Sequence, residues 1–455
     1  MKTLFPSNFN WPIFALIAIV IRVLFVGMSW VSYLAILLAL HQFMLLFIAI
    51  GHIIPIRYLL GAFMCVQFFI GPSLAYNGLD EFQYIHYKMK VPEIEYFGYA
   101  IPAVMSFILG LHFFAGKLNG EILDQKQISL FVARHSELPY WFIGIGFVTS
   151  IVAGFFGAEF AFVFYLLGGF KFIGLFLLII GSSELKILPL VVVIGSIVAS
   201  SLGEGMFHDL LTWIIFTGSI MAIKYKFGFN SKLIASGAFI FLAVTIQLLK
   251  SSYRNATGEG EEAGVETFSK LYEEQNKDKS LFSFESLAPA TVRINQGFII
   301  TNIMYNVPNL IPYSEGEEMY QIFEAAILPR ILAPNKLNAG DRSLFMKYSG
   351  LRIRQGTSMG LSSLGDAYIN FGNTGGCIFM LLLGLLYGAV LNKFYKESRN
   401  YPVLILFTAL VFYYPIRPDC ELQTILGHLF KSCFLIYIMI LLFKNTFRIP
   451  IAARN

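Results

Sequence analysis

Long apolar runs separated by short polar segments dominate the chain. Many runs reach the roughly 20 residues that an α-helix needs to cross a bilayer, and backbone groups in hydrocarbon must be hydrogen-bonded within their own segment. The pattern therefore predicts an all-α polytopic membrane protein with about twelve transmembrane helices. We expect these spans at residues 11–28, 33–51, 56–76, 96–115, 139–156, 159–180, 187–202, 208–223, 233–249, 370–391, 402–416 and 424–443.

The positions of Lys and Arg between the spans predict the topology. With a cytoplasmic N-terminus, the inner segments carry fifteen Lys and Arg, whereas the short outer loops carry three. Because inner loops are enriched in these residues, both termini are expected in the cytoplasm. The stretch 11–51 also admits another partition into spans. The chain then divides into spans one to nine (1–249), an extracytoplasmic segment (250–369), and spans ten to twelve with a cytoplasmic tail (370–455).

The extracytoplasmic segment is the only long polar region in the sequence. Its first part, residues 255–279, is rich in Gly, Glu and Lys, which predicts a solvated loop. The apolar stretch 298–311 is too short to span a bilayer, so it either lies in the interface or dips in and returns. Residues 315–332 place apolar side chains at helical spacing. They predict a helix lying on the outer leaflet.

Composition narrows the possible functions. The chain is 56% hydrophobic and 13% charged, against roughly 25% charged residues in ordinary soluble domains. Its net charge of +5 comes mostly from cations at span ends, so it predicts no nucleic-acid partner. The four cysteines show no paired spacing typical of a disulfide framework or a metal site. We therefore expect no metal and no cofactor.

Five cations lie close together near the end of the extracytoplasmic segment. A guanidinium group keeps its charge and binds phosphate through a planar fork. The cluster therefore predicts a binding site for a lipid-linked phosphate or diphosphate, where positive charge would neutralise a leaving group. Ordinary cations beside lipid headgroups are the alternative. The five residues are Arg330, Lys336, Arg342, Arg352 and Arg354.

A run rich in Gly and Ser, residues 356–365, follows this cluster and leads into the tenth span. It can direct backbone N–H groups at an anion, or it is a flexible entry loop. Asp366 directly after it is a candidate general base, although its carboxylate is equally suited to cap the helix. Tyr368 and Asn370 follow two and four residues later and are candidates for the same pocket.

Two other outer positions carry polar groups. Glu204 and His208 are four residues apart at the start of the eighth span, so a helix would place them on one face. A polar contact facing the active cavity is the favoured interpretation, because zinc would need further ligands. The last outer loop carries Arg417, Asp419 and Glu421. These residues either contact the ligand or pair with one another in a surface charge network.

Taken together, this topology and the cationic outer segment resemble the bacterial oligosaccharide repeat-unit polymerases, the Wzy-type O-antigen polymerases. The closest local match is Pro329-Arg330, Pro334-x-Lys336 and the stretch 363–375, Ser-Leu-Gly-Asp-Ala-Tyr-Ile-Asn-Phe-Gly-x-x-Gly. That family often shows a Gly-Glu-x-Tyr-x-Asn-Phe-Gly-like stretch in this place. Asp366 stands where Glu is common, and its side chain is one methylene shorter.

The resemblance implies a GT-C-like, metal-independent glycosyltransferase of the bacterial inner membrane with an extracytoplasmic active site. The donor would be an undecaprenyl-diphosphate-linked glycan, and the acceptor a sugar hydroxyl of a second lipid-linked repeat unit. The product would be a surface polysaccharide, as in lipopolysaccharide or capsule. Arg330, Arg342 and Arg352 would hold the diphosphates, and Asp366 or His208 would assist deprotonation. A chain-length regulator and a flippase are the protein partners that we expect, beside membrane lipids.

Two alternatives stay open on the sequence. A ligase that transfers finished glycan uses the same chemistry, so the residues hardly separate it from a polymerase. A flippase or exporter of lipid-linked glycans belongs to a different class and should carry polar residues through the bilayer midplane. This chain concentrates its polar residues at the predicted outer face. That asymmetry favours an active site there.

Overall fold

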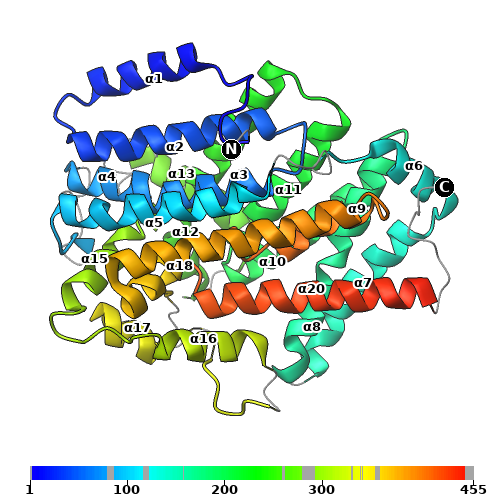
Figure 1. The fold of residues 1–455 in the computed structure, drawn as a ribbon. Helices are drawn as coiled ribbons and strands as arrows, with labels where there is room; N and C mark the ends of the chain where they lie inside the picture. Colours follow the sequence, from blue (N-terminus) through cyan, green and yellow to red (C-terminus); the bar gives the residue numbers. More distant parts are fainter. Residues whose placement is uncertain are drawn as a thin grey trace.

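A computed structural model describes residues 3–78, 87–115, 122–156, 158–258, 262–278, 293–328, 332–338, 340, 342–353 and 359–445, with backbone only for 158–161, 275–278 and 444–445. Every regular element in these ranges is helical and none is a strand, which confirms the all-α prediction. The helices, drawn in Figure 1, are α1 (Trp11–Leu24), α2 (Trp30–Ala49), α3 (Ile56–Cys65), η1 (Val66–Ile70), α4 (Gly71–Tyr76), α5 (Glu93–Phe113), α6 (Gln125–Arg134), α7 (Leu138–Val152), η4 (Ala153–Phe155), α8 (Ala158–Gly168), α9 (Phe170–Gly181), α10 (Ile187–Glu204), α11 (His208–Lys224), α12 (Phe229–Gly258), α13 (Val265–Asp278), α15 (Gly297–Asn306), α16 (Glu317–Ile327), α17 (Arg342–Ser349), α18 (Ser362–Glu397), α19 (Leu404–Val411) and α20 (Leu422–Asn445).

Nine helical stretches in the described part of the chain are long and apolar enough to cross a membrane. The chain is therefore a multi-pass helical membrane protein. Each of the nine overlaps one of the twelve expected spans. They are Trp30–Ala49, Ile56–Tyr76, Glu93–Phe113, Leu138–Phe155, Phe162–Gly181, Ile187–Glu204, Phe229–Gly258, Ser362–Glu397 and Leu422–Phe443.

The other three expected spans coincide with shorter helices. Helix α1 has 14 residues, α11 has 17 and α19 has 8. At a rise of about 1.5 Å per residue, α19 is far shorter than the hydrocarbon core of a bilayer. The sequence pattern predicted a span that ends at Ile416, because apolar residues continue to this position. In the structure α19 ends at Val411 and the chain forms turns from 412 to 416. The total of twelve spans, the GT-C-like arrangement and the sidedness stay predictions.

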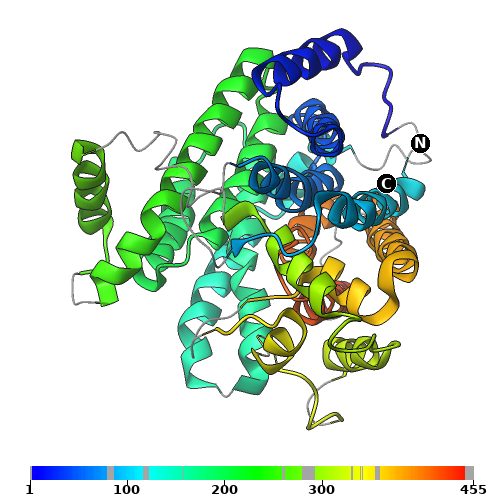
Figure 2. The same cartoon turned by 90° about the vertical axis from the view of Figure 1, so that its left-hand side faces the viewer.

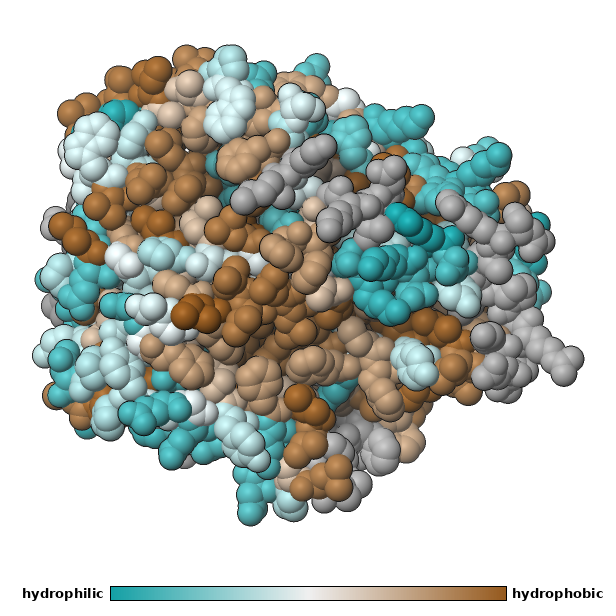
Figure 3. All heavy atoms as spheres, in the orientation of Figure 1, coloured by the Kyte–Doolittle hydropathy of each residue, from teal (hydrophilic) through white to brown (hydrophobic). Residues whose placement is uncertain are grey.

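The long helices run side by side. Figure 1 shows α2, α5, α18 and α20 extending in broadly the same direction, and Figure 2 views them nearly end-on. Helices α15, α16 and α17, from the predicted outer segment, lie together at the lower left of Figure 1, with α16 packed along α20. Figure 3 shows a broad hydrophobic face across the middle, with hydrophilic side chains gathered toward its margins. Exposed apolar surface on this scale fits a lipid environment.

Helix α18 is held in place by a close crossing with α5. A Cβ added at Gly384 would lie 2.1 Å from the Phe107 carbonyl oxygen, and one added at Gly110 would lie 2.3 Å from the Leu381 carbonyl oxygen. Small residues allow helix backbones in membranes to approach this closely. The Tyr99 hydroxyl adds a 2.7 Å hydrogen bond to the Leu364 carbonyl. This crossing positions the first turns of α18, which carry candidate site residues.

Gly384→Leu should destabilise the protein by about 1–3 kcal/mol or more, since the added side chain has no room between the two backbones. The thermal unfolding midpoint of the detergent-solubilised protein measures this effect. Gly98→Leu, also on a membrane-length helix, is the matched control, because a Cβ at Gly98 meets no atom within 4 Å. Equal midpoints for the two variants would contradict the close crossing.

Candidate functional site

A kink at Gly372 divides α18 into two parts. Its backbone angles are φ 65° and ψ −161°, a conformation that essentially only glycine adopts. A Cβ there would lie 3.2 Å from the Tyr313 ring. The kink therefore explains the final Gly of the Asn-Phe-Gly sequence. It leaves the first ten residues of α18 free to pack against the predicted outer segment at their own angle.

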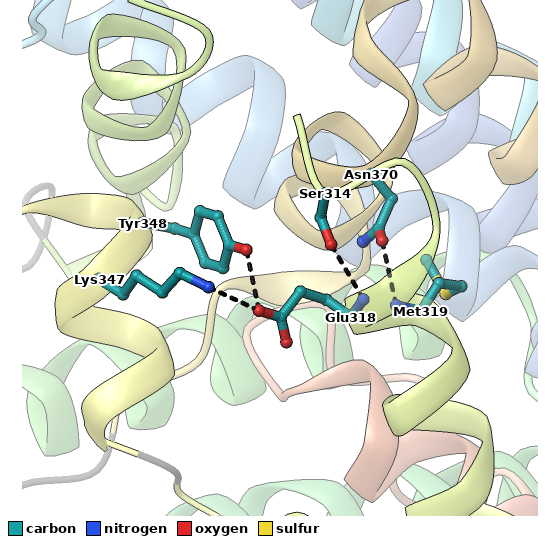
Figure 4. Close-up of polar contacts among 6 residues, drawn as sticks. All are labelled: Ser314, Glu318, Met319, Lys347, Tyr348 and Asn370. Atoms are coloured by element: carbon teal, nitrogen blue, oxygen red, sulfur yellow. Dashed lines mark hydrogen bonds and ion pairs between the residues drawn. The ribbon is translucent and has the colours of Figure 1, made fainter. Parts of the chain in front are cut away.

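Asn370, near the end of this first part, joins α18 to α16 (Figure 4). Its side-chain oxygen accepts a 3.0 Å hydrogen bond from the Met319 N–H, and its amide nitrogen donates to the Asp366 carbonyl at 2.8 Å. Asn370 is almost fully buried. It therefore satisfies backbone groups rather than facing a ligand.

The buried Glu318 carboxylate joins α16 to α17 in the same view. One of its oxygens accepts hydrogen bonds from Lys347 Nζ and from the Tyr348 hydroxyl, both at 2.9 Å. The Glu318 N–H donates to Ser314 Oγ at 2.9 Å. Side-chain hydrogen bonds from the Lys347 ammonium group to Tyr348 and Glu318 raise the pKa of Lys347, which stays charged. The network fixes α16, α17 and the start of α18 as one unit.

Asn370→Ala should lower the free energy of unfolding by about 1–3 kcal/mol, because it leaves the Met319 N–H buried without its acceptor. The thermal unfolding midpoint in detergent reports the change. Asn309→Ala is the control, since Asn309 is exposed and its side chain donates to the Tyr305 carbonyl of its own turn. A midpoint for Asn370→Ala that matches this control would show that the network has no stabilising role.

Beside this unit lies a cavity of about 600 Å³. It brings together three predicted site residues from distant parts of the sequence: His208 at the start of α11, Arg342 at the start of α17, and Arg417 in the loop between α19 and α20. Asp419 and Glu421 from the same loop also line it. The cavity thus presents cationic, anionic and titratable groups to one space.

Both arginines have unused donors in the cavity. The Arg417 guanidinium carbon lies 5.1 Å from the centre of the Tyr414 ring, a cation–π geometry. Arg342 Nε is buried and has no hydrogen-bond partner. Among the described residues neither guanidinium forms an ion pair. Since a buried, unpaired donor costs free energy, these groups favour an anionic ligand.

The side chains of His208 and Asp209 contact each other at the edge of the cavity, with His208 Nε2 against Asp209 Oδ1. The contact with Asp209 holds the imidazole at this position. A neutral imidazole has one ring nitrogen that can accept a proton from a ligand. His208 is therefore the candidate base that lies in the cavity itself.

Asp366 lies behind the cavity wall. It is 5% exposed and lines a separate space of about 20 Å³ together with Glu421. Its carboxyl group accepts a hydrogen bond from the Leu422 backbone. The N-cap position of α18 is Leu361, and Asp366 is the fifth residue of the helix, so it does not cap the helix. The geometry gives Asp366 a role in holding the start of α20 beside Glu421.

The remaining predicted residues lie elsewhere. Lys336 Nζ donates to the Ala325 carbonyl at 3.1 Å and to the Leu328 carbonyl, at the C-terminal end of α16. Arg352 is exposed and is not among the residues lining the cavity. Tyr368 is buried, with ring-centre distances of 5.0 Å to Tyr99 and 5.9 Å to Tyr313. Arg330 and Arg354 lie outside the described residues.

Three further cations near the cavity were missed from the sequence. Lys250 lies within electrostatic range of Arg293, Arg254 and the cavity residue Arg417. Burial lowers the pKa of Arg293, and Arg254 lowers it further, while Tyr87 opposes the change. Lys250 and Arg254 are four residues apart in α12, and this spacing could have indicated from the sequence that both cations lie on one face of a helix. These cations make the surroundings of the cavity more favourable for an anion.

Within the described ranges, no three His, Cys, Asp or Glu side chains are grouped as metal ligands. The arrangement offers instead guanidinium donors for an anion, carboxylates that can accept hydrogen bonds from hydroxyl groups, and an imidazole that can accept a proton. Comparisons with protein-family models, curated proteins and solved structures give no match to this chain.

Proposed function

We propose that this protein is a glycosyltransferase of the bacterial inner membrane that polymerises lipid-linked oligosaccharide repeat units. The observation that supports this most strongly is the cavity lined by Arg342, Arg417 and His208 in a chain of membrane-length helices. An anionic substrate that lives in a membrane suits these residues, and the diphosphate of an undecaprenyl-linked glycan combines both properties.

The chemistry follows from the cavity residues. Arg342 and Arg417 bind the donor diphosphate and stabilise the charge that develops as the bond from the sugar anomeric carbon to the diphosphate oxygen breaks. A hydroxyl of the acceptor repeat unit forms the new glycosidic bond, and His208 takes its proton. Asp419 and Glu421 accept hydrogen bonds from sugar hydroxyls. The products are the extended glycan and the free lipid diphosphate.

The carboxylates help to distinguish this proposal from simple anion binding. A site for inorganic phosphate alone would gain nothing from Asp419 and Glu421, because like charges repel. A glycan attached to a diphosphate needs both kinds of group. One carboxylate is also fixed in place: Glu421 Oε2 accepts a 2.8 Å hydrogen bond from the Gly340 N–H and a 3.2 Å bond from Gln423 Nε2. A ligase would use the same groups with another acceptor.

Deletion of the coding sequence in its own host tests the proposal. The expected result is that long surface glycans disappear and single repeat units remain on the outer face, as gel electrophoresis of extracted glycans would show. Re-expression of the intact chain should restore the long forms. Lipid-linked units confined to the cytoplasmic face would instead indicate an exporter. Complete polymer left on the lipid carrier would indicate a ligase.

A further inference from the structure

A large apolar groove lies between α10 and α11 and shares no lining residue with the polar cavity. Its volume is about 830 Å³. The lining side chains on α10 extend from Leu190 to Leu202, which corresponds to about 18 Å along the helix axis. On α11 the lining includes Ile214 and Met221. A groove of this length covers more than half the thickness of a bilayer core.

Two glycines leave space in the groove. Gly195 on α10 and Gly218 on α11 both line it, and a Cβ added at either would meet no atom within 4 Å. In the α5–α18 crossing, by contrast, the glycines allow helix backbones to touch. Gly195 and Gly218 therefore widen the groove rather than close a helix contact. The resulting space is lined mainly by aliphatic side chains, which suit a hydrocarbon chain.

The predicted outer end of the groove leads toward positive charge. Leu202 lines the groove, and a Cβ added at Gly205 would lie 3.0 Å from Arg254 Cγ. Residues 263–265 close the groove near this end, where Phe268 packs against Phe207 with ring centres 5.8 Å apart. Lys250, one turn before Arg254 in α12, lies within electrostatic range of both Arg254 and Arg417.

Residues that line the groove and residues that line the cavity are also close together along the chain. The turn 205–207 alone separates α10, which forms one wall of the groove, from His208, which lines the cavity. A ligand with its hydrocarbon chain in the groove would bring an anionic group to Arg254 and Lys250. Lys250 is within electrostatic range of Arg417, which lines the cavity, so a headgroup attached there would lie on the side of the cavity. An ordinary phospholipid has no large headgroup to fill about 600 Å³.

We infer that the α10–α11 groove binds the polyprenyl chain of the diphosphate-linked acceptor, whose diphosphate Arg254 and Lys250 hold at the mouth of the groove, while Arg342 and Arg417 bind the diphosphate of the donor. This inference rests on the proposed function for the identity of the headgroup. It adds a defined site for the lipid chain, and it assigns binding roles to Arg254, Lys250, Gly195 and Gly218.

Photolabelling of the purified full-length protein in detergent tests the inference. The probe is a polyprenyl diphosphate that carries a diazirine midway along its chain, and labelled peptides are identified by mass spectrometry. We expect labels on α10 and α11. Unlabelled polyprenyl diphosphate should suppress them, whereas the same concentration of phosphatidylglycerol should not. Labels found elsewhere, or suppression by both lipids alike, would overturn the inference.

Substitutions that fill the groove provide the second arm. Gly195→Leu and Gly218→Leu should each reduce labelling about tenfold, because the added side chain occupies space that the lipid chain needs. Gly144→Leu in α7 is the control, since a Cβ at Gly144 also meets no atom within 4 Å and Gly144 does not line the groove. Undiminished labelling in both groove variants would overturn the inference.

The outcome is independent of whether glycan transfer occurs. If the labels lie on α10 and α11 but the purified protein joins no repeat units, the assignment of the groove as a lipid-binding site is supported and the proposed function is contradicted. If repeat units are joined while the labels lie on other helices, the proposed function stands and the groove assignment fails.

Discussion

Replacing His208 with alanine should lower the rate of repeat-unit joining by about 10²–10⁴-fold, the usual contribution of a positioned general base. His208 lines the cavity, and its Nε2 contacts Asp209 Oδ1. The loss should appear in kcat, with little change in KM for the donor, because the imidazole acts on the acceptor hydroxyl in the transition state. Steady-state kinetics with a purified lipid-linked oligosaccharide measure both constants.

His52→Ala is the matched control for this experiment, because His52 is exposed in the turn between α2 and α3. It should leave both constants unchanged. Asp209→Asn should give an intermediate loss, since the imidazole stays in place but loses the carboxylate that orients it. A His208→Ala enzyme with full kcat would exclude His208 as the base and direct the same experiment to Glu421.

Replacing Arg417 with alanine should lower kcat/KM for the lipid-diphosphate donor by about 10²–10³-fold, the range seen when one donor to a developing negative charge is removed. Arg417 has no ion-pair partner among the described residues, and Tyr414 supports its guanidinium group. Asp419 and Asp209 lie within electrostatic range of Arg417, so the unfolding midpoint of the variant is compared with that of the unaltered protein. Arg417→Lys should recover part of the activity, because it keeps the charge but loses the fork.

Arg399→Ala serves as the control for this series. Arg399 is exposed just beyond the C-terminal end of α18, and its removal should change neither stability nor kinetics. If Arg417→Ala keeps the kcat/KM of this control, the diphosphate is bound elsewhere and the cavity is not the donor site. A lower unfolding midpoint in Arg417→Ala would show that the loss of activity reflects folding, so the midpoint is measured alongside.

The fold class could be predicted because apolar runs in a membrane protein have few structural solutions. The lengths of individual helices could not. Apolar residues continue through the turns after Val411, so the hydropathy pattern does not mark the end of α19. The kink at Gly372 was likewise invisible, because a glycine within an apolar run fits a straight helix as well as a bent one.

The candidate site was predictable by residue type but not by arrangement. The cationic residues and His208 could be identified from the sequence because charged groups at the ends of membrane spans are costly to desolvate and are often functional. Which of them meet is decided by tertiary packing. Among the members of the predicted cation cluster that the structure describes (Lys336, Arg342 and Arg352), Arg342 alone lines the cavity, where Arg417 joins it. Lys336 instead binds the end of α16. Asp366 holds the Leu422 backbone, a contact that no local sequence pattern indicates.

The most direct measurement is reconstitution of the purified protein with one defined undecaprenyl-diphosphate-linked repeat unit and no other protein. The account predicts that glycans of two or more units appear together with free undecaprenyl diphosphate, and that Arg417→Ala forms neither. Repeat units that remain single after prolonged incubation with folded protein, with no lipid diphosphate released, would contradict it.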